Sequence, residues 1–236
     1  MLKEIQKKKR LVLLDAHAIL HRAYHALPEL TAPDGSPSGA LYGVSSMLLK
    51  ILIDLSPDFI VACYDLPGST YRHDAFEGYK ATRVKTDDAL INQIRTSRDI
   101  FNAFGIPIYE APGFEADDIL GTIVKKMEKQ KEWEIIIASG DMDTMQLIDG
   151  TRVRVYTFKK GVKDTILYDE KAVVERFGFL PSKLIDFKGL RGDPSDNIPG
   201  VFGVGEKTAT MLIKTFGTIE NMYCIIKKNP DVLKNI

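Results

Sequence analysis

The sequence predicts a three-layer α/β fold, in which helices cover both faces of a mostly parallel sheet, followed by a smaller helical region. Three features of the 236 residues support this prediction. Apolar runs of strand length recur along the chain, stretches with helical spacing separate them, and several runs end shortly before an acidic residue. Short continuous apolar runs are typical of strands buried on both faces, and their alternation with helices favours parallel order.

The first predicted elements form a β-α-β unit. Residues 11–14 are an unbroken apolar run that ends at Asp15, as expected of a buried strand. Apolar positions with helical spacing follow in residues 44–55. A second apolar run, residues 59–64, then ends at Asp65, so two strand ends each deliver a carboxylate.

The middle of the chain continues this alternation after an interruption. Residues 68–90 are polar and carry few periodic apolar positions, which predicts an arch segment that extends outside the core. Helical spacing returns in residues 90–101, and a third strand is expected at 106–110, shortly before Glu115. Apolar positions in residues 119–127 then predict the inward face of another helix.

The last predicted strands lead into the helical region. Residues 134–139 form a fourth strand before Asp141, while residues 152–158 and 162–168 alternate and predict edge strands or a hairpin. From Asp169 onward the pattern is helical and is broken by prolines and glycines. We therefore expect a core over 1–178 and a helical region over 179–236.

Composition limits the classes of protein to consider. Lys plus Arg and Asp plus Glu both total 32, so a nucleic-acid partner would need a local basic patch. Cys63 and Cys224 are the only cysteines, which argues against a zinc site or a disulfide framework and fits a reducing compartment. No stretch is long enough to span a bilayer, so we expect a cytoplasmic protein.

Acidic residues gather at the predicted strand ends and in one later cluster. They are Asp15, Asp65, Glu115, Asp117, Asp118, Asp141, Asp143, Asp193 and Asp196. Parallel strands bring their carboxyl ends to one edge of a sheet, and carboxylates sharing a site resist joint ionisation unless cations are present. Oxygen ligands favour Mg²⁺ or Mn²⁺ over zinc, and so many acids predict two ions.

Each acidic group also has an ordinary structural explanation. The cluster that begins at Glu115 could complement a helix dipole, the pair at Asp141 could form a turn, and the pair at Asp193 could cap helices. Their coincidence favours a shared site instead. The four histidines have no partner at metal-ligand spacing, which favours packing, surface or substrate contacts: His17, His21, His25 and His73.

Two basic segments indicate contact with nucleic acid. In residues 72–83 cations are interleaved with aromatic rings, which suits single-stranded nucleic acid, although a solvated loop would read similarly. In residues 197–209 three glycines precede Lys207 and Thr208, which open a helix. This is not a P-loop because Glu206 separates the glycine from the lysine, so a hairpin between two short helices fits better.

Six motifs occur in an order that resembles a known family. They are Asp15 after its strand, Tyr64-Asp65, Tyr79-Lys80-x-x-Arg83, Glu115-Ala116-Asp117-Asp118, Ser139-Gly140-Asp141-Met142-Asp143 and the run from Gly192-Asp193 through Asp196 to Ala209. Over nearly its whole length the chain resembles the 5′-nuclease domain of bacterial DNA polymerase I, within the flap endonuclease family. The resemblance implies a PIN-like nuclease core and a C-terminal helix-hairpin-helix. The family continues beyond a position equivalent to Ile236, so a truncated helical region is expected.

The resemblance also implies an activity and its residues. It implies a monomeric, structure-specific 5′→3′ exonuclease and flap endonuclease that cuts DNA flaps and RNA primers in replication and repair, with a polymerase in the same or a separate chain. The nine acids above would bind two Mg²⁺ ions, or Mn²⁺, and Asp118 would be catalytic together with Lys80 and Arg83. The implied nucleic-acid contacts are Arg72, Tyr79, Lys80, Arg83, Gly203, Gly205, Lys207 and Thr208. K⁺ would bind at the hairpin.

Two other classes of function stay open at this point. A non-catalytic flap-binding module would explain the arch and the hairpin but would leave the acids without a purpose. A small-molecule phosphatase could use Asp15 as its nucleophile, but such enzymes need a second acid two residues on, and that position is His17.

Overall fold

The computed structural model describes residues 8–161, 164–230 and 232, and contains a six-stranded sheet with the order β3-β2-β1-β4-β5-β6. The strands are β1 (Lys9–Asp15), β2 (Phe59–Cys63), β3 (Ile108–Tyr109), β4 (Trp133–Ala138), β5 (Val153–Lys160) and β6 (Asp164–Tyr168). β1 to β5 pair in parallel, and β6 is antiparallel to β5. The prediction of a mostly parallel sheet is therefore confirmed.

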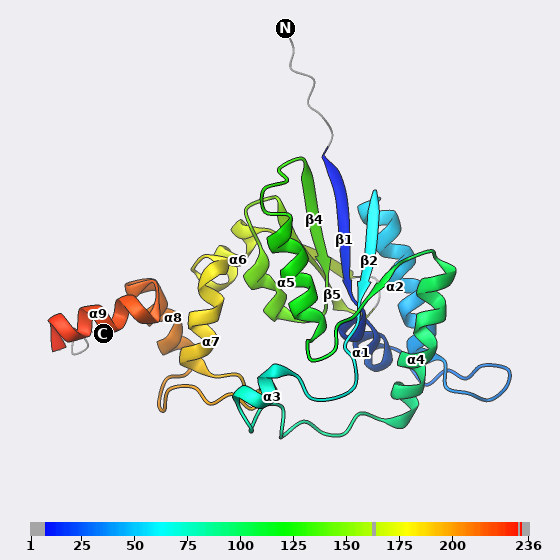
Figure 1. The fold of residues 1–236 in the computed structure, drawn as a ribbon, viewed down its shortest axis with the longest axis horizontal. Helices are drawn as coiled ribbons and strands as arrows, with labels where there is room; N and C mark the ends of the chain where they lie inside the picture. Colours follow the sequence, from blue (N-terminus) through cyan, green and yellow to red (C-terminus); the bar gives the residue numbers. More distant parts are fainter. Residues whose placement is uncertain (1–7, 162–163, 231, 233–236) are drawn as a thin grey trace, which may run out of the picture.

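Helices cover both faces of this sheet (Figure 1). They are α1 (Ala16–Ala26), α2 (Gly39–Leu55), α3 (Tyr71–Ala75), α4 (Asp88–Ala103), α5 (Ala116–Lys126), α6 (Glu170–Phe177), α7 (Leu184–Arg191), α8 (Glu206–Phe216) and α9 (Ile219–Lys228). Short 3₁₀ turns are η1 (Met142–Leu147), η2 (Pro181–Lys183) and η3 (Pro194–Asp196). In the described part of the chain, no helix combines the length and the apolar character needed to cross a membrane.

The alternation of side chains along β1 divides the interior into two apolar clusters. Val12 and Leu14 face a cluster formed with α1, α2 and α4. Leu11 and Leu13 face the other cluster, which continues through α5 into α7 and α8. Both faces of the strand are buried, which explains why its sequence is an unbroken apolar run rather than an alternating one. The helical C-terminal region thus extends the second layer of the core.

Two features differ from what the sequence predicts, and part of a third prediction lies outside the described residues. α1 was not predicted, although it follows directly from Asp15. The strand expected at 106–110 pairs only over Ile108–Tyr109. The last strand is expected to begin at 162, but residues 162 and 163 lie outside the described part. The same holds for residues 1–7 of the predicted core and for residues 231 and 233–236 of the predicted helical region.

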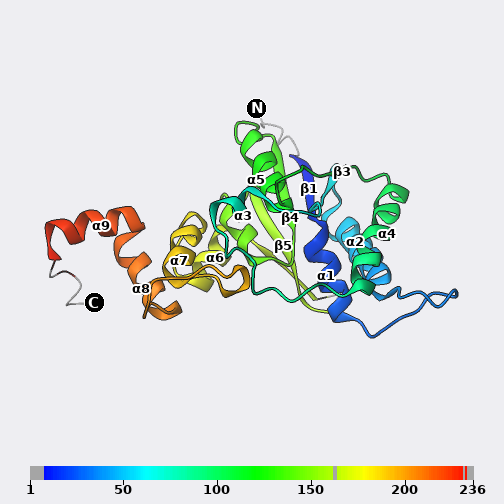
Figure 2. The same ribbon diagram turned by 60° about the horizontal axis from the view of Figure 1, so that its bottom comes forward.

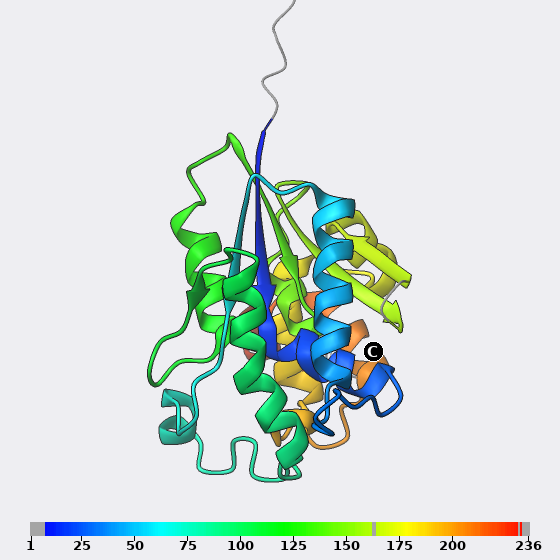
Figure 3. The ribbon, with the colours of Figure 1, turned by 90° about the vertical axis from the view of Figure 1, so that its right-hand side faces the viewer.

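The arch segment crosses the carboxyl edge of the sheet between β2 and α4 (Figure 3). It contains α3, and the residues after α3 contact the C-terminal region. The Lys80 amide donates to the Asp196 carbonyl (2.9 Å), and the Asn197 amide side chain donates to the Gly78 carbonyl (2.7 Å). This segment therefore lies against the 193–197 loop rather than projecting freely.

The C-terminal region is a helix-hairpin-helix, as expected. α7 and α8 flank a hairpin over 192–205, and α8 and α9 extend away from the sheet (Figure 2). Gly192 has a φ of +82°, and a Cβ atom there would lie 2.4 Å from the Gly200 amide nitrogen. The Val201 amide donates to the Leu190 carbonyl (2.8 Å). Glycine is required at 192 because two backbone segments cross there.

Candidate active site

The carboxyl ends of β1 and β4 meet through one buried serine. Ser139 follows β4, and its hydroxyl donates to Asp15 Oδ2 (2.7 Å) while accepting from the Asp141 amide (2.9 Å). The other oxygen of Asp15 accepts from the Ala18 amide (3.0 Å), so Asp15 is also the N-cap of α1. Because β1 and β4 are paired neighbours, the acids that follow them are held side by side.

Asp65 and Asp117 complete a group of carboxylates with Asp15 and Asp141. Asp65 follows β2 and accepts from the Ala116 amide (2.6 Å), which ties it to the start of α5. All four acids, together with Glu115, line one cavity of about 380 Å³. The acids expected at three separate strand ends and at one helix start are therefore brought to a common place.

The ionised form of the carboxyl groups is disfavoured in this cavity. Burial, reinforced by the neighbouring carboxylates, raises the pKa of Asp117 to about 8. Burial likewise raises the pKa of Asp15 to about 6, with Asp65 and Asp141 adding to the increase. A carboxyl group that stays protonated at neutral pH, as Asp117 does, is the expected result when several acids share a buried site.

The donor chemistry of this group fits hard divalent cations. Its members offer carboxylate oxygens, which Mg²⁺ and Mn²⁺ prefer, and their mutual repulsion would be relieved by such ions. Among the residues that the structure describes, no three or more His, Cys, Asp or Glu side chains stand close enough to hold an ion as they are placed. Ligation through water, which Mg²⁺ commonly uses, asks for fewer direct contacts.

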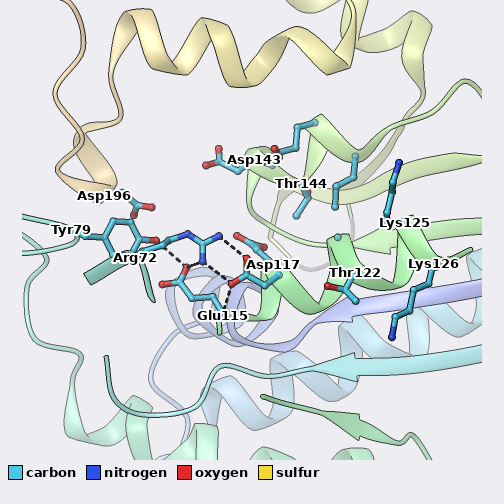
Figure 4. A pocket seen from close by; sticks show the side chains of 14 residues that line it. Arg72, Tyr79, Glu115, Asp117, Thr122, Lys125, Lys126, Asp143, Thr144 and Asp196 are labelled. Atoms are coloured by element: carbon cyan, nitrogen blue, oxygen red, sulfur yellow. Dashed lines mark hydrogen bonds and ion pairs between the residues drawn. The ribbon is translucent and has the colours of Figure 1, made fainter. Parts of the chain in front are cut away.

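Three cations of the arch pair with acids of the site, and Figure 4 shows one of them, Arg72, beside Glu115. Arg72 donates to both oxygens of Asp118 (2.7 and 2.9 Å), and Lys80 donates to Glu115 (2.7 Å). Arg83 pairs with Asp196 (2.5 Å). Arg72 and Asp118 line a second cavity of about 710 Å³, to which Glu115, Asp117 and Asp196 also contribute, whereas Lys80 and Arg83 line the smaller cavity with the carboxylates. The arch thus places its positive charges where the acids gather.

Lys188 of α7 joins two more of the predicted acids. Its Nζ contacts Asp143 and donates to Asp193 (2.7 Å). The predicted acids that hold a Lys or Arg of this chain are therefore Glu115, Asp118, Asp143, Asp193 and Asp196. Sequence reasoning missed Lys188, and it quoted Ser139 within a motif without giving that residue a role.

The remaining residues predicted to contact nucleic acid are either buried or lie outside the two cavities. Tyr79 is only 6 % exposed and donates its hydroxyl to Glu115 (3.0 Å), so in this arrangement its ring is not open to a base. Gly203, Gly205, Lys207 and Thr208 lie in the hairpin and the first turn of α8, and line neither cavity.

The histidines of α1 extend the wall of the smaller cavity. His17 and His21 both line it. The Nδ1 atom of His17 accepts from the Asp65 amide (3.1 Å), and burial lowers the pKa of His17. A neutral imidazole that accepts a backbone hydrogen bond positions Asp65 rather than offering a cation.

A parallel sheet with acids at its carboxyl edge, a cationic arch and a helix-hairpin-helix together define a nuclease domain of the phosphodiester-hydrolysing class. The chain belongs to the 5′-3′ exonuclease family. Residues 10–178 match the family's N-terminal resolvase-like domain, and residues 179–236 match its C-terminal SAM fold.

Relatives of known identity agree with this assignment. The chain is 43 % identical over 219 residues to DNA polymerase I of Bacillus caldotenax, and 42 % identical over 217 residues to that of Bacillus subtilis. These matches cover 93 % and 92 % of the chain, but only 25 % and 24 % of the relatives. The chain therefore spans about a quarter of their length.

Solved structures confirm the fold. The T5 5′-exonuclease with bound zinc superposes with a TM-score of 0.72 at 24 % identity, covering 94 % of this chain and 80 % of that one. Human GEN1 in complex with Holliday junction DNA gives a TM-score of 0.58 at 15 % identity, covering 95 % of this chain and 55 % of that one.

Proposed function

We propose that the chain is a divalent-metal-dependent 5′ nuclease that hydrolyses phosphodiester bonds at 5′ flaps, nicks and RNA primers in branched DNA. One observation carries the proposal: Asp15, Asp65, Asp117 and Asp141 line a single cavity at the carboxyl edge of the sheet. The core over 1–178, with its arch at 68–90, would cut the strand, and the region over 179–236 would hold the duplex. A polymerase would act on the same branched DNA, since the relatives are DNA polymerases I.

Within this proposal the acids divide into two groups. Asp15, Asp65, Glu115, Asp117 and Asp118 would hold one Mg²⁺ or Mn²⁺ ion, and Asp141, Asp143, Asp193 and Asp196 a second, directly or through water. Bound ions at such a site supply an ionised water and offset the charge that develops on the phosphate. The raised pKa of Asp117 supports this assignment, because only a nearby cation would keep that carboxylate ionised at neutral pH.

The arch cations would exchange partners when substrate binds. Lys80 and Arg83 are held by Glu115 and Asp196. With Glu115 and Asp196 engaged as metal ligands, Lys80 and Arg83 would be released from these pairs and would contact the scissile phosphate. Arg72 would remain on both oxygens of Asp118 and keep the arch anchored, so Asp118 would reach its ion through water. Lys80 and Arg83 would then stabilise the transition-state charge.

The hairpin would hold the duplex without reading its sequence. Gly203 and Gly205 have no atom within 4 Å of a built Cβ, so a DNA backbone can approach them closely. The exposed side chain of Lys207 would meet a phosphate. Hairpin carbonyls would supply the ligands for K⁺.

The test is digestion of end-labelled flap, nicked and single-stranded substrates with and without Mg²⁺. The wild-type protein should release 5′-phosphate products only with the ion, and Asp141→Asn should lose about 10²–10³ in rate or more. Asp99→Asn is the matched control, because Asp99 is an exposed carboxylate on α4 that lies outside both cavities. Full activity of Asp141→Asn would refute the site.

One observation favours a second function, a flap-binding module without catalysis. Protein cations already neutralise several of the acids, as the pairs of Arg72 and Lys188 show. Tight binding of the flap substrate with no product under either Mg²⁺ or Mn²⁺ would establish that module and exclude the nuclease.

A further inference from the structure

Phe202, in the hairpin between α7 and α8, is an apolar side chain that the fold leaves entirely in solvent. Its relative accessibility of 104 % is the highest of the exposed large hydrophobic residues in the described chain. Single apolar residues on a surface are ordinary, but most of them keep part of their area against a neighbour. A ring with no covering at all has no packing role in the folded chain, so its role must be sought in a partner.

The backbone that carries this ring is fixed by hydrogen bonds on both sides of it. The Val204 amide donates to the Val201 carbonyl (2.9 Å), and Gly203 has a φ of +80°, so residues 201–204 form a tight turn with the glycine where positive φ is required. The Val201 amide is bound to the Leu190 carbonyl (2.8 Å) at the end of α7. Val204 packs against the larger apolar cluster. Little backbone freedom would therefore be lost when Phe202 meets a partner.

The surroundings of the turn suit a phosphate backbone. Gly205 is the N-cap of α8 and provides no side-chain cap, so the first amides of that helix have no partner from a capping side chain. Lys207 is exposed in the same first turn. Figures 1 and 2 both place the hairpin toward the edge of the molecule that carries α3. A ring four residues before the first of these amides would meet the sugars next to a bound phosphate.

We propose that Phe202 is a wedge that packs against deoxyribose rings in the minor groove of double-stranded DNA. The inference rests on the proposed function, because it assumes that the hairpin holds the duplex. Proteins that bind the minor groove commonly insert apolar side chains, phenylalanine among them, into it. Phe202 adds affinity that depends on neither base sequence nor charge, while the amides of α8 and Lys207 fix the neighbouring phosphates.

The decisive measurement is equilibrium binding of a fluorescent blunt duplex in EDTA, by anisotropy, over a range of salt concentrations. Phe202→Ala should bind about tenfold more weakly at every salt concentration. Its salt dependence should run parallel to that of the wild type, because an apolar contact releases no counterions. Lys207→Ala should instead lower the salt slope by about one. Phe202→Trp, which keeps a large ring, should retain wild-type affinity.

The control is Ile53→Ala. Ile53 is 76 % exposed near the end of α2, a few residues before β2 begins, and so lies at the opposite edge of the sheet. Its removal should leave binding unchanged. Affinity of Phe202→Ala within about twofold of the wild type would overturn the wedge. A loss of salt slope equal to that of Lys207→Ala would do the same, since it would reveal a damaged phosphate site. A wild-type protein that fails to cleave flaps but shows the Phe202 effect would refute the nuclease and leave the wedge standing.

Discussion

At the scale of single residues, Ser139 organises the acids more directly than any of the acids themselves. It is 1 % exposed, and its hydroxyl is shared between Asp15 and the Asp141 amide. Asp15 and Ser139 are 124 positions apart, so no local pattern joins them. The acids were predictable because each follows an apolar run, but the serine that orients two of them depends on the pairing of β1 with β4.

We expect Ser139→Ala to lower the Mg²⁺-dependent cleavage rate about 10- to 100-fold, because outer groups that orient metal ligands commonly have effects of that size. The unfolding free energy should also fall by about 1–3 kcal/mol, since Asp15 and the Asp141 amide each lose a partner. Ser97→Ala is the matched control. Ser97 is likewise fully buried, and its hydroxyl bonds to the Tyr64 hydroxyl (2.6 Å) and the Ile94 carbonyl (2.7 Å) rather than to an acid of the site.

Thermal denaturation and single-turnover cleavage separate the two effects. Ser97→Ala should lose stability but keep its cleavage rate. Equal rates for Ser139→Ala and Ser97→Ala would show that Ser139 only stabilises the fold and does not position the site.

At the scale of elements, the sequence predicted correctly those helices and strands whose buried residues form a clear apolar pattern along the chain. β1, β4 and α5 were recognised for that reason. α1 was missed although Ala16, Ile19, Leu20 and Ala23 are buried on one face at helical spacing. Two of those positions are alanines, which carry little hydrophobic signal. β3 is shorter than predicted because Pro107 lacks an amide hydrogen and the strand lies at the sheet edge.

The hairpin supplies an element-scale prediction about backbone crossing. Gly192→Ala should lower the unfolding free energy by about 2–4 kcal/mol, because positive φ and a close contact with Gly200 act together. Gly203→Ala should cost about 1 kcal/mol, since Gly203 has a similar φ of +80° but open space around it. Chemical denaturation measures both. Equal losses in the two variants would mean that the crossing of backbones at 192 imposes no constraint.

At the scale of the whole molecule, a net charge of zero conceals a strong internal separation. Acids gather at the carboxyl edge of the sheet, and their partners arrive from the arch and from α7. The acids are thus paired with cations from distant parts of the chain, and composition alone could not reveal these pairs. The remaining imbalance lies in the cavity of Asp15 and Asp117, whose pKa values are raised to about 6 and about 8.

This imbalance predicts how stability depends on pH and on metal ions. Asp117 keeps its proton in the folded state up to about pH 8, whereas the unfolded chain loses it near pH 4. The folded state therefore binds more protons, and the unfolding free energy of the metal-free protein should fall as pH rises. Burial lowers the pKa of His17 and of His21, which makes stability rise with pH up to about 6.5. The effect of Asp117 is therefore best isolated above pH 7.

Between pH 7 and pH 8.5 we expect a loss of about 1 kcal/mol, or about 3 °C in Tm, for the metal-free protein. Added Mg²⁺ should raise Tm more at pH 8.5 than at pH 7, because metal binding requires the ionised carboxylate and opposes its repulsion. Asp117→Asn should remove most of the pH dependence in EDTA and weaken the Mg²⁺ effect, while Asp99→Asn should behave as the wild type. A metal-free Tm that stays constant or rises over this interval would show that Asp117 is ionised without a divalent ion, and the strongest physical reason for placing a metal beside it would then be lost.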